Sequence, residues 1–247
     1  MNVPLSLPDI SELEIDYVTR ALRSGQLSLG PRVPEFEEKF AAYIGARHAI
    51  AVNSGTSALH LAVRALDIGR GDEILTTSFS FVASANCALF EGALPVFLDI
   101  DRETLNLDAR ALRLFLSGSC VLDRLTSVVT DVRTARRVRA ILPVHVFGLA
   151  CDMDPIRELA REYNLCIIED ACEALGATYR GQSVGTFGDL GVFAFYGNKQ
   201  MTTGEGGMIV TKSGELASLC RSLRNQGRDT QSDGLRHIRV GYNYRLS

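Results

Sequence analysis

Residues 191–211 read Gly-Val-Phe-Ala-Phe-Tyr-Gly-Asn-Lys-Gln-Met-Thr-Thr-Gly-Glu-Gly-Gly-Met-Ile-Val-Thr. The apolar run 192–195 predicts a buried strand, and a second strand is predicted over 207–211. The polar turn between them carries Lys199 and leads into a glycine cluster whose backbone can approach a ligand closely. A lysine amine held at the end of a rigid strand can form a Schiff base with a carbonyl compound, although most single loop lysines are simply exposed.

A second apolar run, residues 166–168, is typical of a parallel strand buried on both faces, and it is followed directly by Glu169 and Asp170. Open α/β sheets bind ligands outside the carboxyl ends of their strands. A carboxylate at Asp170 could therefore pair with the protonated ring nitrogen of a cofactor. The alternative is that Asp170 only caps the next turn or helix.

A third segment, residues 49–63, predicts a strand, a turn containing Gly55, Thr56 and Ser57, and an amphipathic helix. The first N–H groups of a helix lack internal partners and attract phosphate, although most such turns are ordinary helix caps. The segment is not a nucleotide P-loop, because no Gly-Lys-Ser/Thr follows. A strand-end carboxylate, a later lysine and an earlier phosphate cradle are together the three attachment points of pyridoxal 5′-phosphate.

The rest of the chain alternates predicted strands and helices, which is typical of a mostly parallel sheet. Strands are predicted at 48–52, 73–77, 95–99, 139–144, 165–169, 191–195 and 207–211. Helices are predicted at 8–24, 34–44, 56–66, 81–91, 108–117, 154–163 and 214–225. We therefore expect an α/β fold, a three-layer α/β/α arrangement with a mostly parallel seven-stranded sheet. Segment 118–136 is predicted to be a surface excursion, and 227–236 an exposed loop.

Composition narrows the possible functions. The 247 residues are 46% hydrophobic, which is enough for a large core, and the net charge of −3 offers no electrostatic footprint for nucleic acid. The arginines between 133 and 139 are interpreted as a solvated strand or helix end. The six cysteines show no Cys-x-x-Cys or metal-ligand spacing, so no metal site is expected. With no signal peptide and no apolar run of membrane-spanning length, we expect a cytoplasmic protein.

The motifs together resemble the DegT/DnrJ/EryC1/StrS family of sugar aminotransferases, which use pyridoxal 5′-phosphate and have the aspartate-aminotransferase (type I) fold. The resemblance runs from about residue 8 to residue 246. Besides the Lys199 segment, the motifs that carry it are residues 53–60, 77–84, 143–148, 151–154, 169–176, 188–191 and 241–245. Each motif alone is weak, but their number and order make the resemblance specific.

The resemblance implies a role for each matching residue. Lys199 matches the lysine that holds the cofactor covalently and moves the proton from the amino donor. Asp170 matches the partner of the pyridine nitrogen, and Gly55, Thr56 and Ser57 match the phosphate-binding turn.

Three further residues match positions around the cofactor. Phe81 matches the aromatic residue that stacks on the pyridine ring, the alternative being a core phenylalanine. Glu173 lies where many members have a glutamine that contacts the cofactor. Asn243 matches an asparagine that reaches the phosphate of the neighbouring subunit's cofactor. The resemblance therefore implies a homodimer with a shared active site.

By the same resemblance, the reaction moves an amino group, with L-glutamate as the expected donor, to a nucleotide-linked keto sugar. The product serves amino-sugar, polysaccharide or cell-surface glycan biosynthesis. A related group of sugar dehydratases has histidine in place of the lysine, so Lys199 argues against that chemistry. A catalytically incomplete cofactor-binding fragment, or a regulatory protein of the family, is the remaining alternative.

The chain departs from the family pattern in three places. Ala194 replaces a serine that donates to the phosphate, a bond that is then lost or supplied by water, Thr202 or Thr203. Gly197 replaces a proline, and the Gly-Asn-Lys turn resembles members that make 4-amino-4,6-dideoxy sugars such as perosamine. Relatives also end in a C-terminal small domain. Residues 1–247 are therefore interpreted as the large, cofactor-binding domain with its N-terminal helices, either truncated or part of a longer protein.

Overall fold

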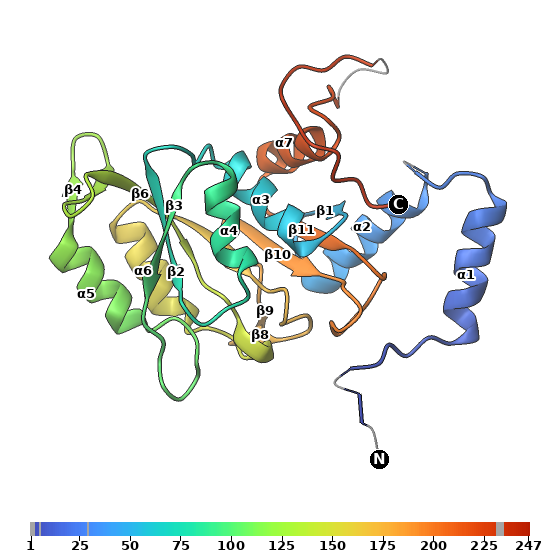
Figure 1. Cartoon of the computed structure of the whole chain (residues 1–247), viewed down its shortest axis with the longest axis horizontal. Coiled ribbons are helices and arrows are strands. Elements are labelled where there is room, and N and C mark those ends of the chain that lie inside the picture. The colour runs from blue at the N-terminus through green and yellow to red at the C-terminus, as the bar shows by residue number, and fades with distance from the viewer. Residues whose placement is uncertain (1–2, 5, 29, 231–234) are drawn as a thin grey trace.

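The computed structural model describes residues 3–4, 6–28, 30–230 and 235–247 (Figure 1). Among these residues the centre is a nine-stranded sheet, seven strands of which lie side by side in the order β1-β11-β10-β7-β6-β2-β3. Only β11 runs antiparallel to its neighbours along this path. The strands are β1 (His48–Val52), β2 (Asp72–Thr77), β3 (Leu94–Leu98), β6 (Arg136–Leu142), β7 (Cys166–Asp170), β10 (Leu190–Ala194) and β11 (Gly207–Thr211). The seven predicted strands and their mostly parallel arrangement are confirmed, but the sheet has nine strands in the described residues rather than the seven expected.

Helices cover both faces of the sheet, which confirms the three layers. Helices α3 (Gly55–Ala65), α4 (Ala83–Phe90) and α7 (Gly214–Arg224) pack on one face, and α2 (Arg32–Ile44), α5 (Ala109–Ser119) and α6 (Met153–Glu162) on the other (Figure 1). Successive residues of a strand pack alternately against the helices on one face of the sheet and on the other. On β2, Ile74 packs with the α3 side and Leu75 with the α5 and α6 side, because successive side chains leave a strand on opposite faces.

Segment 118–136 differs from the prediction of a surface excursion. It forms a hairpin of β4 (Cys120–Asp123) and β5 (Val128–Asp131), and β5 pairs antiparallel with the first half of β6. Val129 is buried against the α5 core, and Asp131 is fully buried because Arg133 pairs with it at 2.7 Å. The polar composition of this segment hid its short strands.

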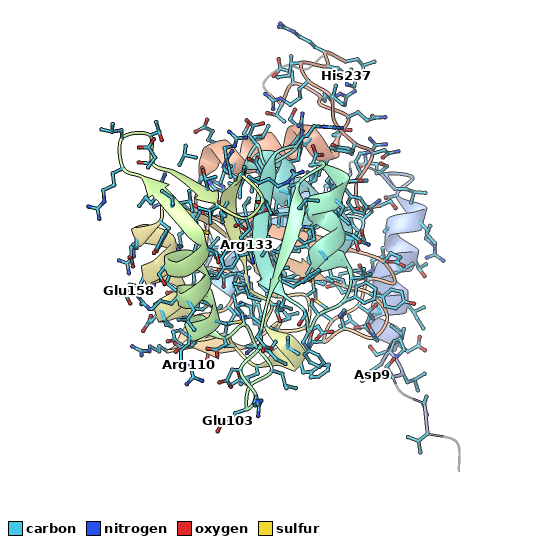
Figure 2. All side chains as sticks on the ribbon, turned by 60° about the vertical axis from the view of Figure 1, so that its left-hand side comes forward. Asp9, Glu103, Arg110, Arg133, Glu158 and His237 are labelled. Carbon is cyan, nitrogen blue, oxygen red and sulfur yellow. The ribbon has the colours of Figure 1, made fainter. Side chains whose placement is uncertain are left out.

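The arginine run, interpreted from the sequence as a solvated strand or helix end, lies at the entry to β6, where two of its arginines pair with buried acids. Arg133 also lies over the ring of Phe115, with 4.6 Å from Cζ to the ring centroid, and Arg137 pairs with buried Asp72 at 2.8 Å. Other charged side chains, such as Glu103, Arg110 and Glu158, lie exposed on the surface (Figure 2).

Smaller elements complete the fold. They are a two-stranded ladder of β8 (Thr178–Tyr179) and β9 (Gln182–Ser183) and a short 3-10 turn, Val146–Gly148. Helix α1 (Glu12–Arg23) stands apart from the sheet and buries none of its residues (Figure 1). In the described part of the chain, no helix combines the length and apolar character needed to cross a membrane. The predicted loop 227–236 overlaps residues 231–234, which lie outside the described residues.

Candidate active site

Lys199 lies in the turn that follows β10, at the carboxyl end of a buried strand. Its N–H donates to the Tyr196 carbonyl at 3.0 Å, and the carbonyl of Phe195 accepts from the Thr203 N–H and the Thr202 hydroxyl. The Lys199 side chain is 18% exposed, so its amine is sheltered yet reachable. The turn therefore holds one primary amine at a defined place beside the sheet.

The amine of Lys199 lies 3.3 Å from Glu173 Oε1. The other carboxylate oxygen of Glu173 accepts a hydrogen bond from the Phe147 N–H at 3.1 Å, and the Glu173 carbonyl accepts one from the Gln200 amide. Glu173 is therefore fixed at both ends, and its charge holds the lysine in the site.

Asp170 ends β7 on the same side of the molecule. It is only 5% exposed. Its Oδ2 accepts a 2.6 Å hydrogen bond from Ser84 Oγ, and its Oδ1 accepts from the Cys172 N–H at 3.1 Å. The second contact is the turn-capping bond that the sequence left open as an alternative. Among the described residues, no basic side chain forms an ion pair with this carboxylate.

The neighbouring acid, Glu169, has a structural role. Its side chain leaves β7 on the opposite face, where it accepts hydrogen bonds of 2.6–2.7 Å from the N–H groups of Gly185, Phe187 and Gly188. His145 Nε2 lies 3.2 Å from the same carboxylate. Glu169 therefore anchors the loop before β10, and His145 is a buried histidine whose two ring nitrogens both have hydrogen-bond partners.

The start of α3 forms the third part of the site. Ser54 caps the helix by accepting a hydrogen bond from the Ser57 N–H at 3.0 Å, and its hydroxyl lies 3.0 Å from that of Ser57. Thr56 is half-buried, and Ser57 is buried. At Gly55, a Cβ atom would meet Ala194 Cβ at 2.7 Å and Cys172 Sγ at 3.0 Å. The helix start is therefore pressed against the end of β10 and the turn after Asp170.

Cys172 packs at the junction of these parts rather than serving as a reactive group. Burial raises the pKa of its thiol well above the ordinary value, and the negative charge of Asp170 raises the pKa further. The structure thus brings Gly55, Asp170, Cys172, Glu173 and Lys199 together at the carboxyl ends of β1, β7 and β10.

Two predicted site residues do not contact this group within the chain. Phe81, just before α4, is 74% exposed, which excludes the alternative of a core phenylalanine. Asn243 is exposed on the segment that follows α7. The hydroxyls of Thr202 and Thr203, considered as replacements for the missing serine at Ala194, both donate to carbonyl oxygens inside their own turn.

Ser84 is the site residue that the sequence did not single out. It lies on α4 and is 2% exposed. Its hydroxyl links the Ser80 hydroxyl to the carboxylate of Asp170 in one chain of hydrogen bonds. The only sequence evidence for Ser84 was its place as the last residue of the motif 77–84. Nothing in the local pattern relates that serine to an acid that lies 86 positions later.

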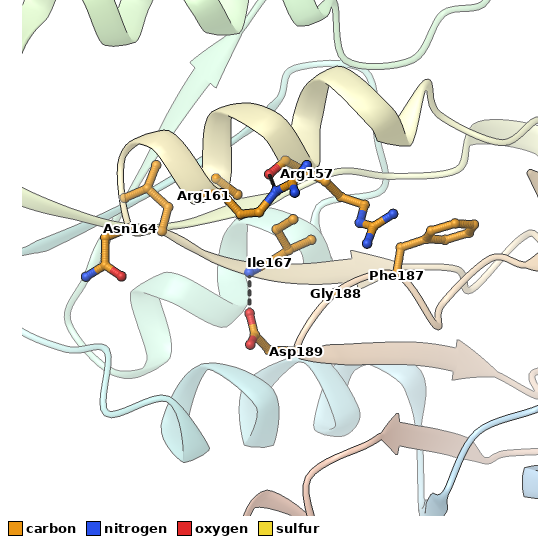
Figure 3. Close-up of a pocket in the computed structure, with 9 residues that line it drawn as sticks. Arg157, Arg161, Asn164, Ile167, Phe187, Gly188 and Asp189 are labelled. Carbon is orange, nitrogen blue, oxygen red and sulfur yellow. Dashed lines mark hydrogen bonds between the residues drawn. The ribbon is translucent and has the colours of Figure 1, made fainter.

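A separate hollow of about 390 Å³ lies between α6 and the starts of β7 and β10 (Figure 3). Its lining includes Arg157, Arg161, Phe187 and Asp189. Because it lies at the amino ends of strands whose carboxyl ends carry Asp170 and Lys199, it is distinct from the candidate site. The described residues contain no group of three His, Cys, Asp or Glu side chains that could hold a metal ion.

Comparison with known proteins adds independent information. The sequence pattern of the DegT/DnrJ/EryC1/StrS aminotransferase family matches residues 8–247. The chain is 45% identical over its whole length to a GDP-perosamine synthase of Caulobacter vibrioides, covering 62% of that protein. It is 44% identical over 91% of its length to the spore coat polysaccharide biosynthesis protein SpsC of Bacillus subtilis, covering 53% of it.

A solved structure agrees with these sequence relatives. The aminotransferase from Psychrobacter cryohalolentis superposes with a TM-score of 0.86 at 35% identity, over 98% of this chain and 60% of that one. The chain thus spans about three fifths of the length of the proteins that it matches.

Proposed function

Because the chain belongs to the DegT/DnrJ/EryC1/StrS aminotransferase family, we propose that it forms the cofactor-binding part of a pyridoxal-phosphate-dependent sugar aminotransferase. The observation that carries this proposal is that Asp170, a buried carboxylate with no ion-pair partner among the described residues, and the sheltered amine of Lys199 lie at the same sheet edge.

The residues fit the cofactor. A buried carboxylate without a counter-ion is costly, and a protonated pyridine nitrogen would supply the missing positive charge at Asp170. The start of α3 offers unpaired N–H groups and a positive dipole end to a phosphate. The absent Cβ of Gly55 lets that helix start approach Ala194 and Cys172 closely. When bound, pyridoxal phosphate supplies an electron sink for the carbon that loses its proton.

Each residue of the chain has a definable part in such a reaction. Lys199 Nζ would hold the cofactor and, once released, take the proton from Cα of the amino donor. Asp170, oriented by Ser84 and the Cys172 N–H, would keep the ring nitrogen protonated. Glu173 would hold the released amine within reach, since its carboxylate is itself fixed by the Phe147 N–H.

The proposed substrates follow from the relatives. The donor is an amino acid, L-glutamate by family analogy. The acceptor is a nucleotide-linked keto sugar, and the similarity to a GDP-perosamine synthase favours a GDP-linked one. Phe81 would stack on the pyridine ring, for which its exposed side chain is free. Asn243 would reach the phosphate of a second copy, which makes the working form a homodimer, and we propose that it acts in the cytoplasm.

The chain spans about three fifths of the length of its relatives, and we propose that the part of them beyond it corresponds to a small C-terminal domain. One experiment separates the enzyme from the alternative of a cofactor-binding fragment or a regulatory protein. The purified chain should be loaded with pyridoxal phosphate, treated with L-glutamate, and then given a GDP-linked keto sugar. Amination of the sugar supports the enzyme. Cofactor binding without any amino transfer supports a cofactor-binding fragment or a regulatory protein.

A further inference from the structure

The segment after α7 is fixed to the chain on both sides of Asn243. The N–H of Tyr244 donates to the Arg224 carbonyl at 3.0 Å, and the Tyr244 carbonyl accepts a hydrogen bond from the Asn53 N–H at 3.0 Å. The backbone of Tyr242 is likewise bonded in both directions, to Leu223 at the end of α7 and to Gln226 just beyond it. Asn243 between them is exposed. The residue proposed to serve a second copy is therefore presented by an anchored backbone, next to Tyr244, whose carbonyl is bonded to Asn53 just before the phosphate-binding turn.

The hydroxyl groups of both flanking tyrosines contact one buried polar cluster. Tyr242 OH donates to Glu91 Oε1 at 2.6 Å, and Tyr244 OH lies 3.0 Å from His60 Nδ1. His60 Nε2 lies 2.8 Å from the same Glu91 oxygen, and Arg64 donates to the other oxygen at 3.3 Å. The side chains of His60 and Glu91 are 6% and 11% exposed. We call these residues the Glu91 cluster.

The donors and acceptors of the Glu91 cluster form one consistent chain. With Tyr244 donating to His60 Nδ1, the proton on Nε2 is free to be donated to Glu91, which also accepts from Tyr242. The two tyrosine rings are stacked, with centroids 5.1 Å apart and planes at 13°, and His60 packs against Tyr242 at 4.7 Å. Each ring is thus fixed by a hydrogen bond at its tip and by a neighbour on its face.

We propose that Glu91 and His60 are positioning residues, which hold Tyr242 and Tyr244 so that Asn243 is presented to the cofactor phosphate of a second copy. This inference rests on the proposed function. The cluster also joins two phosphate contacts, because His60 lies on α3, whose first turn would bind the phosphate of the same chain. The Glu91 cluster therefore sets the distance between the first turn of α3, which would bind the phosphate of the same chain, and Asn243, which would bind the phosphate of the partner.

A purely structural role is the competing interpretation. The cluster could simply stabilise α3, in which case breaking it would damage the phosphate turn of the same chain. The two roles differ in which site is affected. A positioning role harms the site of the partner, whereas a structural role harms the site of the altered chain.

The first test compares pyridoxal phosphate affinity by equilibrium dialysis. The variants are Asn243→Ala, the double variant Tyr242→Phe/Tyr244→Phe, and their combination. We expect each of the first two to weaken binding about 5- to 10-fold, the effect of about one lost hydrogen bond. The combination should be no weaker than Asn243→Ala, because both changes remove the same contact. Losses that multiply would overturn the positioning role.

Asp72→Asn is the matched control, since Asp72 is a buried, arginine-paired carboxylate at the start of β2 that is not part of the Glu91 cluster. It should lower thermal stability and leave cofactor affinity unchanged.

The second test uses mixed dimers. Chains with Tyr242→Phe/Tyr244→Phe are mixed with Lys199→Ala chains, and the visible absorbance of lysine-bound cofactor is titrated. The mixed dimer contains one site with an intact Lys199 and an intact Asn243 from its partner. Recovery of about wild-type affinity at that site supports positioning across the dimer. Failure to recover assigns the damage to the altered chain itself and overturns the inference.

The outcomes separate this inference from the proposed function. If Asn243→Ala binds the cofactor as tightly as the wild type, the shared site and the positioning role both fall. If Asn243→Ala weakens binding and the tyrosine variant does not, the shared site stands and only the positioning role falls.

Discussion

Ser84 Oγ and Asp170 Oδ2 are joined by a 2.6 Å hydrogen bond between α4 and the end of β7. Ser84 is 2% exposed and Asp170 5%, so the bond lies out of water. A charge-assisted bond of this kind fixes the direction of the carboxylate as well as stabilising its charge. Ser84 on α4 therefore sets the orientation of the Asp170 carboxylate, which is proposed to contact the ring nitrogen of the cofactor.

Ser84→Ala removes this donor and leaves Oδ2 buried without a replacement. We expect the free energy of unfolding to fall by about 1–3 kcal/mol and pyridoxal phosphate to bind about tenfold more weakly. Chemical denaturation and equilibrium dialysis measure the two effects. Ser117→Ala is the control, because its exposed hydroxyl donates to carbonyl oxygens within α5; an equal loss in that variant would rule out a specific role for Ser84.

Asp170→Asn should separate stability from function. Removing a buried charge that has no counter-ion relieves its desolvation cost, while an amide can still meet Ser84. We expect the cofactor-free variant to melt at a temperature no lower than the wild type and to bind the cofactor poorly. A clear fall in the melting temperature of the cofactor-free protein would show that Asp170 is a structural acid.

Gly55→Ala should displace the start of α3, because its Cβ would lie 2.7 Å from Ala194 Cβ. We expect at least a tenfold loss of cofactor affinity, about 1.4 kcal/mol. Adding Ala194→Gly removes the clashing atom and should restore part of the affinity. Gly118→Ala on α5 meets no atom within 4 Å and serves as the control, with unchanged binding. Absence of any rescue by Ala194→Gly would contradict the steric explanation.

Tyr242 makes the Glu91 cluster sensitive to alkaline pH. Burial, followed by its hydrogen bond to Glu91, raises the pKa of Tyr242 from 10.0 to about 12. The folded state therefore keeps this proton where the unfolded chain has lost it, and the stabilisation is present below pH 10 and lost as the pH rises toward 12. Denaturation midpoints of the wild type should fall more steeply over this range than those of Tyr242→Phe. Parallel curves would contradict the raised pKa.

The sequence predicted the elements well because their patterns are local. Apolar runs mark β7, β10 and β11, and the Ser/Gly/Thr turn marks the start of α3. The same local view could not separate Glu169 from Asp170, since adjacent residues of a strand differ only in the face that they occupy. Which face holds the loop 185–188 and which holds α4 is a property of the packed sheet.

Contacts between distant segments were beyond the sequence. His60 gave no signal, because its partners Glu91 and Tyr244 are 31 and 184 positions away. The β4–β5 hairpin was missed because its buried acid, Asp131, reads as a loop residue until Arg133 is seen to neutralise it. In both cases, polar residues are buried through partners that only the fold brings near.

The most direct measurement is to reduce the pyridoxal-phosphate-loaded chain with borohydride and map the labelled peptide by mass spectrometry. The chain has three lysines, Lys39, Lys199 and Lys212, so the assignment is unambiguous. The site described above predicts the cofactor mass on Lys199 alone, and its loss when L-glutamate is added before reduction. Labelling of Lys39 or Lys212 at comparable levels, or no label at all, would contradict the assignment of Lys199 and Asp170 as the cofactor site.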